Sequence, residues 1–130
     1  MNVLVGSDGV IRGAIGGHQD TAADSALSII VCPLLRGRIP CVVPHVTTLI
    51  TPGKSVDVVV TEYGIAVNPA RPEVRERLLA AGLQVVDIHD LAAKAESIIG
   101  KPDPLPFKEK VVGIVMNRDG SVLDEIHEIG

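Results

Sequence analysis

Aromatic residues are almost absent from this chain, which has one tyrosine, one phenylalanine and no tryptophan among its 130 residues. A sandwich with an aromatic-rich core is therefore disfavoured. The hydrophobic fraction is nevertheless 46%, and Val, Ile, Leu and Ala supply nearly all of it. Because domains are commonly about 100–150 residues long, the sequence predicts one packed α/β domain with a single core.

An excess of positive charge is also lacking, since the formal net charge is -4. No run of Lys or Arg alternates with stacking aromatics, so nucleic acid is not an expected partner. Apolar runs are no longer than a strand, well short of the roughly 20 residues that span a bilayer. The first residues lack the charged and apolar regions of a signal peptide. We therefore expect a cytoplasmic protein that does not contact a membrane.

Cysteine is scarce, with only Cys32 and Cys41. Neither belongs to a C-x-x-C pair or lies beside histidines at the spacing of zinc ligands. A disulfide is not expected in a reducing compartment. We interpret both as small apolar strand residues outside the candidate site, and we predict no metal.

The hydrophobic pattern divides into short strands and helices. Pro72, apolar residues at helical spacing and a closing Gly82 predict a helix over 72–81. Asp87 as a cap predicts a second helix over 88–99. A short helix is expected from Thr21 to Ala26, with Asp20 or Thr21 as its N-cap. The expected strands cover 3–5, 10–15, 28–34, 41–44, 46–50, 56–61, 83–86, 111–116 and 122–126.

Four features predict how these elements are arranged. The uninterrupted apolar run from Ser28 to Leu34 predicts a central strand that is buried on both faces. Turn residues at 7–9 and 117–120 predict a hairpin at each end of the chain, and the Pro-rich segment 101–106 predicts an extended connector. The alternation of strands and helices favours parallel pairing. The predicted fold class is α/β: an open, mostly parallel or mixed sheet flanked by helices, with terminal β-hairpins.

The stretch from Gly13 to Thr21 is the first candidate functional segment. Its three glycines lie between a strand and a helix, where bare backbone N–H groups could approach an anion or a thioester closely. His18 and Asp20 could serve as acid, base or orienting groups. The spacing matches neither a dinucleotide-binding pattern nor a P-loop, so a tight turn that needs glycine stays an alternative. Asp20 could equally cap the helix, and His18 could face solvent.

Thr61-Glu62-Tyr63-Gly64 is the second candidate segment, because it ends a buried strand, where α/β sheets place their ligand residues. Glu62 could act as a general base, as an orienting carboxylate or as a nucleophile. Tyr63 could close a pocket or only pack against its neighbours. The alternative is an ordinary strand end that Gly64 turns.

The order of several blocks resembles the alpha subunits of citrate lyase. They are the glycine stretch with Ala22-Ala23, the strand from Ser28 to Leu34, Arg36-Gly37-Arg38-Ile39-Pro40, Val46-Thr47-Thr48, Thr51-Pro52-Gly53 and the run from Val56 to Pro69. The likeness covers essentially the whole chain. A more distant similarity reaches the beta half of family I CoA-transferases, which has a Gly-Gly-x-x-Asp loop and a Thr-Asp/Glu-x-Gly strand end in the same order.

The resemblance implies that residues 1–130 are the C-terminal part of a CoA-transferase-like α/β domain. It also implies an acyl exchange, in which citrate replaces acetate on an acyl carrier protein before the beta subunit releases oxaloacetate. The implied partners are the beta subunit and the acyl carrier protein, which is the gamma subunit. The thiol would belong to its dephospho-CoA-derived arm, or to CoA, and no cofactor would be bound covalently here.

The implied site combines both candidate segments. Glu62, His18 and Asp20 would be the catalytic residues. Gly16, Gly17, Thr21, Tyr63, Gly64, Arg36 and Arg38 would bind substrate or thioester. The two arginines could form forked hydrogen bonds to citrate carboxylates, although an exposed loop arginine is more often only solvated. The glutamate that forms the thioester in family I lies upstream of the glycine loop and has no counterpart here. We therefore expect the 130-residue chain alone to be inactive.

Two other functions stay open. The chain could be a non-catalytic assembly module that completes the sheet of the alpha subunit and docks its partners. It could instead belong to the transferase subunit of malonate decarboxylase or to a related acyl-CoA hydrolase, which share the glycine loop. A cut through a domain would expose an apolar sheet edge or face, so self-association is expected.

Overall fold

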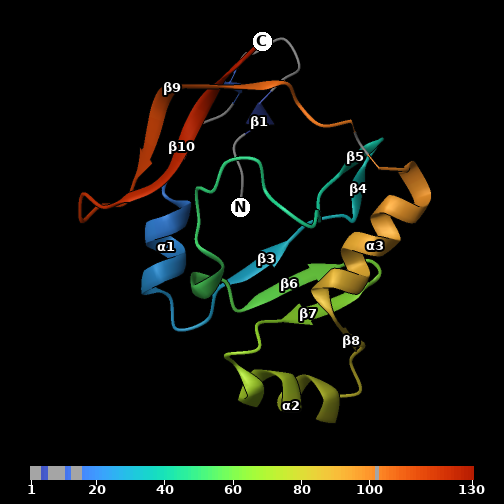
Figure 1. The fold of residues 1–130 in the computed structure, drawn as a ribbon. Helices are drawn as coiled ribbons and strands as arrows, with labels where there is room; N and C mark the ends of the chain where they lie inside the picture. The colour runs from blue at the N-terminus through green and yellow to red at the C-terminus, as the bar shows by residue number, and fades with distance from the viewer. Residues whose placement is uncertain (1–3, 6–10, 13–15, 102) are drawn as a thin grey trace. The chain divides into compact units, whose positions relative to one another are not determined.

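The computed structural model of the chain describes residues 4–5, 11–12, 16–101 and 103–130. These residues divide into two compact units (Figure 1). The first unit comprises Met1–Asp24, Val46–Ser55 and Pro102–Gly130, and the second comprises Ser25–His45 and Val56–Lys101. Each unit has its own cluster of buried apolar side chains, whereas the sequence predicted a single core. Among the described residues, no helix is both long and apolar enough to cross a membrane.

The second unit is built on a four-stranded sheet with the order β3-β6-β7-β8. The strands are β3 (Ile29–Val31), β6 (Val58–Thr61), β7 (Gly64–Val67) and β8 (Val85–Val86). β3 pairs with β6 and β7 pairs with β8 in parallel, while β6 and β7 form an antiparallel hairpin. The sheet is therefore mixed, and the predicted α/β class is confirmed.

Two helices accompany this sheet, α2 (Pro72–Ala80) and α3 (Ile88–Ile99). Both confirm the predictions made from caps and apolar spacing. Asp87 accepts a hydrogen bond from the backbone N–H of His89 at 2.8 Å, and Gly100 ends α3 with a positive φ of 80°. Gly82, with a φ of 75°, follows the last turn of α2. The local signals were sufficient here because capping satisfies backbone groups that the helix itself leaves unpaired.

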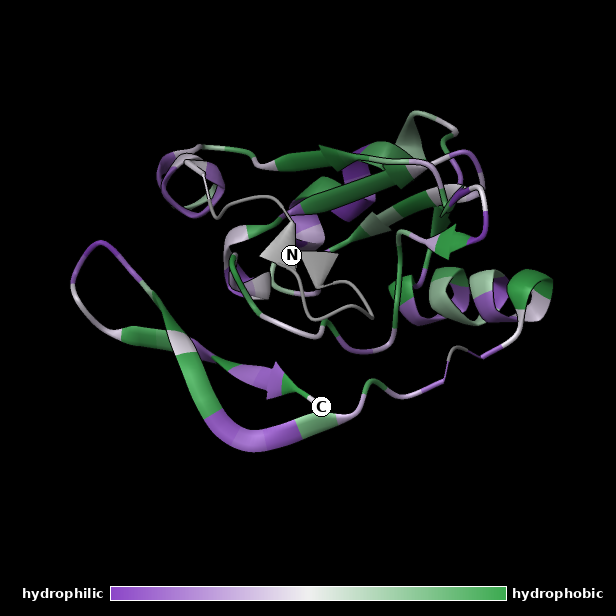
Figure 2. Cartoon of the chain, turned by 90° about the horizontal axis from the view of Figure 1, so that it is seen from above, coloured by the Kyte–Doolittle hydropathy of each residue, from purple (hydrophilic) through white to green (hydrophobic). Residues whose placement is uncertain are grey.

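The core of the second unit lies between one face of the sheet and α3. Ala66 and the half-buried Val59 and Val86 share this face and pack with Leu91, Ala92 and Ala95 of α3. In Figure 2 the strands of the sheet are coloured as hydrophobic, while α3 alternates between hydrophobic and hydrophilic bands. This pattern is that of an amphipathic helix on an apolar sheet.

β3 departs from its prediction. Among the described strands it lies at the edge of the sheet, and Ile29 and Val31 are 51% and 76% exposed. The prediction of a central strand buried on both faces is therefore wrong for these residues. An apolar run indicates which strand can be buried, but neighbouring segments decide whether it is.

The segment after β3 was also predicted incorrectly. A small hairpin of β4 (Leu35–Arg36) and β5 (Ile39–Pro40) turns at Gly37, whose φ is 63°. The strands expected over 41–44 and 46–50 do not form as predicted. Pro44 lacks the N–H that a strand ladder requires, and the N–H of Leu49 donates to the Asp124 carboxylate at 2.5 Å.

The first unit contains a long curved hairpin of β9 (Phe107–Met116) and β10 (Val122–Ile129), which confirms the predicted C-terminal hairpin (Figure 1). Val115, Leu123 and Ile126 of this hairpin pack with Ile50. β1 (Leu4–Val5) and β2 (Ile11–Arg12) form the predicted N-terminal hairpin, whose turn lies outside the described residues. A short 3-10 helix, η1 (Gly53–Ser55), completes the unit.

α1 (His18–Asp24) begins earlier than predicted. The N–H of Thr21 donates to the carbonyl of Gly17 at 2.9 Å, which closes the first helical turn. Asp20 and Thr21 therefore lie inside that turn, and neither is the N-cap. Of the loop expected from Gly16 to Thr21, only Gly16 and Gly17 precede the helix. The residues after Gly17 can adopt a helical conformation, which tertiary contacts can stabilise.

Candidate functional site

The predicted site residues are divided between the two units. Gly16, Gly17, His18, Asp20 and Thr21 belong to the first unit. The second unit contains the remaining ones, Arg36, Arg38, Glu62, Tyr63 and Gly64. Each group has its own surroundings, which determine what its side chains can do.

The glycine pair before α1 presents bare backbone to solvent. Gly16 and Gly17 are both exposed, and the φ of Gly16 is 57°, in the left-handed region that favours glycine. His18 follows as the first helical residue and is exposed as well. Gly13, the other glycine of the predicted stretch, lies outside the described residues.

Contacts with the β9–β10 hairpin hold α1 in place within the first unit. Arg118, in the turn of the hairpin, donates to both carboxylate oxygens of Asp24 at 2.6 and 2.9 Å. Its Nε also lies 3.9 Å from Asp20. The amide of Gln19 donates to the carbonyl of Met116 at 3.1 Å. The hairpin therefore orients the helix that carries His18 and Asp20.

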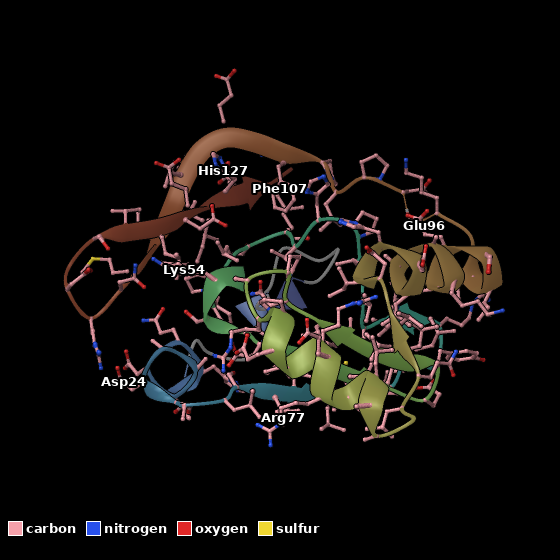
Figure 3. The ribbon with its side chains drawn as sticks, turned by 90° about the horizontal axis from the view of Figure 1, so that it is seen from below. Asp24, Lys54, Arg77, Glu96, Phe107 and His127 are labelled. Carbon is pink, nitrogen blue, oxygen red and sulfur yellow. The ribbon has the colours of Figure 1, made fainter. Side chains whose placement is uncertain are left out.

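The ion pair between Arg118 and Asp24, at the end of α1, shifts the pKa of Asp24. Hydrogen bonds from Arg118 lower the pKa of Asp24 below its ordinary value, and the positive charge adds to this effect. Figure 3 labels Asp24 on α1 and Lys54 on η1, another element of the first unit. A spacing argument could not have found Arg118, because 94 residues separate it from Asp24.

Glu62 lies in the two-residue turn between β6 and β7. Its carboxylate accepts a hydrogen bond from the backbone N–H of Leu34, with distances of 3.2 and 2.9 Å to its two oxygens. Leu34 is fully buried, so its N–H requires this acceptor. Glu62 therefore anchors the segment after β3 to the end of β6, while its exposed position leaves it accessible to a ligand.

A second carboxylate performs the equivalent task at the opposite end of the same strand pair. Asp57 precedes β6 and accepts a hydrogen bond from the buried N–H of Ser28 at 2.8 Å. Its other oxygen accepts from Arg71 at 2.9 Å. β3 and β6 are thus joined by a carboxylate at each end, which gives Glu62 a structural function independent of any chemistry.

The rest of the β6–β7 turn is also tightly arranged. The Thr61 hydroxyl donates to the Gly64 carbonyl and accepts from the Tyr63 N–H, both at 3.1 Å. Gly64 has a φ of 137°, and a Cβ added there would come within 2.9 Å of the Val86 methyl groups. Only glycine fits this position without strain.

Lys94 of α3 is a neighbour that the sequence did not indicate. Its Nζ lies 5.6 Å from the centre of the Tyr63 ring, within cation–π distance. Tyr63 is 43% exposed, so it does not pack as a core residue. The β6–β7 turn therefore presents a carboxylate and an aromatic ring, and α3 places the ammonium group of Lys94 beside that ring.

Cys32 lies close enough to the β6–β7 turn for the charge of Glu62 to affect the pKa of its thiol. Burial raises the pKa of the Cys32 thiol, and the neighbouring Cys41 and Glu62 raise it further. Arg36 has a smaller effect in the opposite direction. Arg36 and Arg38 are exposed on the β4–β5 hairpin. Among the described residues, no three His, Cys, Asp or Glu side chains gather as metal ligands.

Taken together, the units define an α/β protein with exposed polar groups at a strand-end turn and a glycine pair before a short helix. Residues 1–129 match the family described as "Citrate lyase, alpha subunit (CitF)". The chain belongs to the citrate lyase alpha subunit family.

Individual relatives agree with this assignment. The citrate lyase alpha chains of Escherichia coli K12 and Klebsiella pneumoniae are 60% and 54% identical over 129 residues. The alpha subunit of citrate lyase from Streptococcus mutans, solved in complex with citrate, is 49% identical and superposes with a TM-score of 0.93. Each comparison covers 99% of this chain and 25% of the relative. The chain therefore spans about a quarter of the length of these relatives.

Proposed function

We propose that this chain forms part of the subunit that exchanges acetate for citrate on the thioester of an acyl carrier protein. The observation that carries the proposal is the match of residues 1–129 to the citrate lyase alpha subunit. A relative that was solved with citrate supports the choice of acyl acceptor. In this exchange the carrier sulfur loses an acetyl group and gains a citryl group, while acetate leaves.

The two candidate segments suit different parts of this exchange. Negative charge develops on the carbonyl oxygen of a thioester under attack, and backbone N–H donors stabilise it. Gly16 and Gly17 are exposed and carry no side chain, so an acyl arm can approach their backbone. The arm, derived from dephospho-CoA on the gamma subunit or supplied as CoA, would provide the thiol. His18 and Asp20 would orient the reacting groups.

The second unit would contribute charge recognition. Arg36 and Arg38 are exposed guanidinium groups on one hairpin and can form forked hydrogen bonds to carboxylates. Tyr63, Gly64 and Thr21 complete the proposed binding residues. The product would pass to the beta subunit in the cytoplasm, and the remainder of a full-length alpha chain would supply further catalytic groups.

A second function, a non-catalytic assembly module, is favoured by one specific observation. Both oxygens of Glu62 lie within hydrogen-bond distance of the Leu34 N–H. A carboxylate that anchors buried backbone need not touch a substrate. The two functions predict different effects of the substitution Glu62→Gln.

The test uses a full-length chimera, in which residues 1–129 of this chain replace the matched region of the E. coli alpha chain. It is assembled with the E. coli beta and gamma subunits, and release of labelled acetate on addition of citrate is measured. Glu62→Gln retains an oxygen that can accept from Leu34, whereas Glu62→Ala retains none. Glu76→Gln on the exposed face of α2 is the matched control.

A catalytic Glu62 predicts that Glu62→Gln lowers exchange at least about 100-fold without changing the melting temperature. An anchoring Glu62 predicts that Glu62→Gln retains exchange, while Glu62→Ala lowers melting temperature and exchange together. Absence of exchange in a folded, assembled chimera would refute the proposed function. Faster exchange with malonate than with citrate would assign the chain to the malonate transferases. Exchange by the 130-residue chain alone would show that the rest of the alpha chain is not needed for catalysis.

A further inference from the structure

One face of the β3-β6-β7-β8 sheet is composed entirely of valine and isoleucine. The strand register places Val31, Val60, Ile65 and Val85 in one row across the four strands. Ile29, Val58 and Val67 form a second row on the same face. We call these seven residues the valine face. α3 packs against the opposite face, which carries Val59, Ala66 and Val86.

The valine face is covered unevenly. α2 contacts β7 and β8, at one side of the sheet. At the other side, Val31 is 76% and Ile29 is 51% exposed, although Val60 and Ile65 in the same sheet are half-buried. Figure 2 shows these strands coloured as hydrophobic. A sheet with parallel strands is normally covered on both faces. Val58, which pairs with Ile29, is only 4% exposed, so among the described residues the cover is missing over Ile29 and Val31 of β3 itself.

The backbone edge of β3 is open on the same side. The Ser28 carbonyl accepts from Val58, and the Cys32 N–H donates to Val60, so alternate residues of β3 point their backbone groups toward β6. Ile29 and Val31 lie between them and point theirs away from β6. In the part of the chain that the structure describes, no strand pairs with this edge. Such an edge is a template for another strand.

We infer that the open edge of β3 and the adjoining valine face bind the portion of a full-length citrate lyase alpha chain that lies outside the 129 matched residues. The relatives are about four times as long as this chain, so they contain enough additional polypeptide for a strand and a covering layer. A segment of the same polypeptide has an effective concentration in the millimolar range, which favours it over a second copy at ordinary protein concentration. The inference rests on family membership and chain length, and it does not depend on the proposed transferase chemistry.

Amide exchange tests the strand pairing directly. Hydrogen–deuterium exchange with electron-transfer fragmentation is measured for the 130-residue chain and for the full-length chimera. The Ile29 and Val31 amides should exchange at least about tenfold more slowly in the chimera, because a new strand would accept their hydrogen bonds. The Ile30 amide, which faces β6 in both proteins, is the internal control. Equal exchange of Ile29 and Val31 in both proteins would overturn the inference.

Matched substitutions test the covering of the valine face. Val31→Lys should lower the melting temperature of the chimera by roughly 4 °C or more and leave that of the 130-residue chain nearly unchanged, because Val31 is already exposed there. Ile98→Lys is the control, since Ile98 is 48% exposed on α3, which packs on the opposite face. It should act similarly in both proteins. Val31→Thr keeps the β-branched shape and provides a milder variant if the lysine chimera does not fold.

The alternative occupant is a second copy of this chain. It predicts that the full-length chimera dimerises and that protection of its Ile29 and Val31 amides rises with its concentration, whereas an edge covered by the rest of the same chain is protected at every concentration. Concentration-dependent protection in the chimera, or an equal effect of Val31→Lys in both proteins, would refute binding by the rest of the alpha chain. None of these measurements uses enzyme activity, so their outcome is independent of the outcome of the exchange assay.

Discussion

Replacement of Asp57 provides a graded test of how β3 is held against β6. Asp57 is 8% exposed and accepts hydrogen bonds from the Ser28 N–H and from Arg71. Asp57→Ala leaves the N–H of Ser28, which is 7% exposed, without an acceptor. An unsatisfied buried backbone group costs about 1–3 kcal/mol, so the free energy of unfolding of the second unit should fall by that amount.

Asp57→Asn separates the two contacts. Its amide oxygen can still accept from Ser28, while its NH₂ group would face the Arg71 guanidinium and lose that hydrogen bond. The loss of stability should therefore be clearly smaller than for Asp57→Ala. Urea unfolding followed by far-ultraviolet circular dichroism measures both variants, since the chain has no tryptophan. Equal losses for the two variants, or a loss below about 0.5 kcal/mol for Asp57→Ala, would refute the reasoning.

Three further outcomes follow from other contacts. Because Arg118 lowers the pKa of Asp24, the ion pair stabilises the first unit above the ordinary carboxyl pKa, and this contribution disappears as pH falls through the lowered value. Melting curves from pH 6 to 2 should show a steeper acid loss for the parent than for Arg118→Met, and parallel curves would contradict this. Gly64→Ala should cost about 1–3 kcal/mol of stability, and this cost should be smaller in a Val86→Ala background, which lacks the methyl groups that a Cβ at position 64 would meet. An equal cost in both backgrounds, measured by urea unfolding, would contradict the steric reasoning. The raised pKa of Cys32 keeps its thiol protonated at neutral pH, so iodoacetamide should modify it more slowly than free cysteine at pH 7, as followed by peptide mass spectrometry, and an equal rate would contradict this.

Elements with strong local signals were predicted correctly. The helix from Pro72 and the helix capped by Asp87 have the expected extents within a residue. The C-terminal hairpin forms around its Asn117 to Gly120 turn. In each case the residues that stop or start the element act within a few positions, through a fixed φ, a cap or a turn.

Elements whose neighbours lie far away in the sequence were predicted less well. α1 begins earlier than predicted, and its Gln19 and Asp24 contact the distant β9–β10 hairpin, which the sequence pattern could not show. The pattern predicted a strand over 46–50, but the backbone N–H of Leu49 donates to the Asp124 carboxylate. β7 was not predicted as a strand, because Gly64 indicated a turn and the pairing with β6 could not be read from the pattern.

The candidate site also combines features that the sequence indicated with contacts that only the tertiary structure shows. The ordered blocks around the glycine stretch and Glu62 were enough to indicate the citrate lyase alpha subunit family, since many residue types in one order rarely agree by chance. The catalytic and binding roles assigned to these residues stay predictions. The contacts of Glu62 with Leu34 and of Tyr63 with Lys94 became visible only in the tertiary structure.

The sequence by itself determined the α/β class, the two capped helices, the C-terminal hairpin and the family, because each depends on local chemistry or on the order of residues. The tertiary structure decided that the chain forms two units, that β3 is an edge strand and that Glu62 anchors buried backbone. These features depend on which distant groups meet, and a buried N–H or an uncovered valine is recognised only once its neighbours are in place.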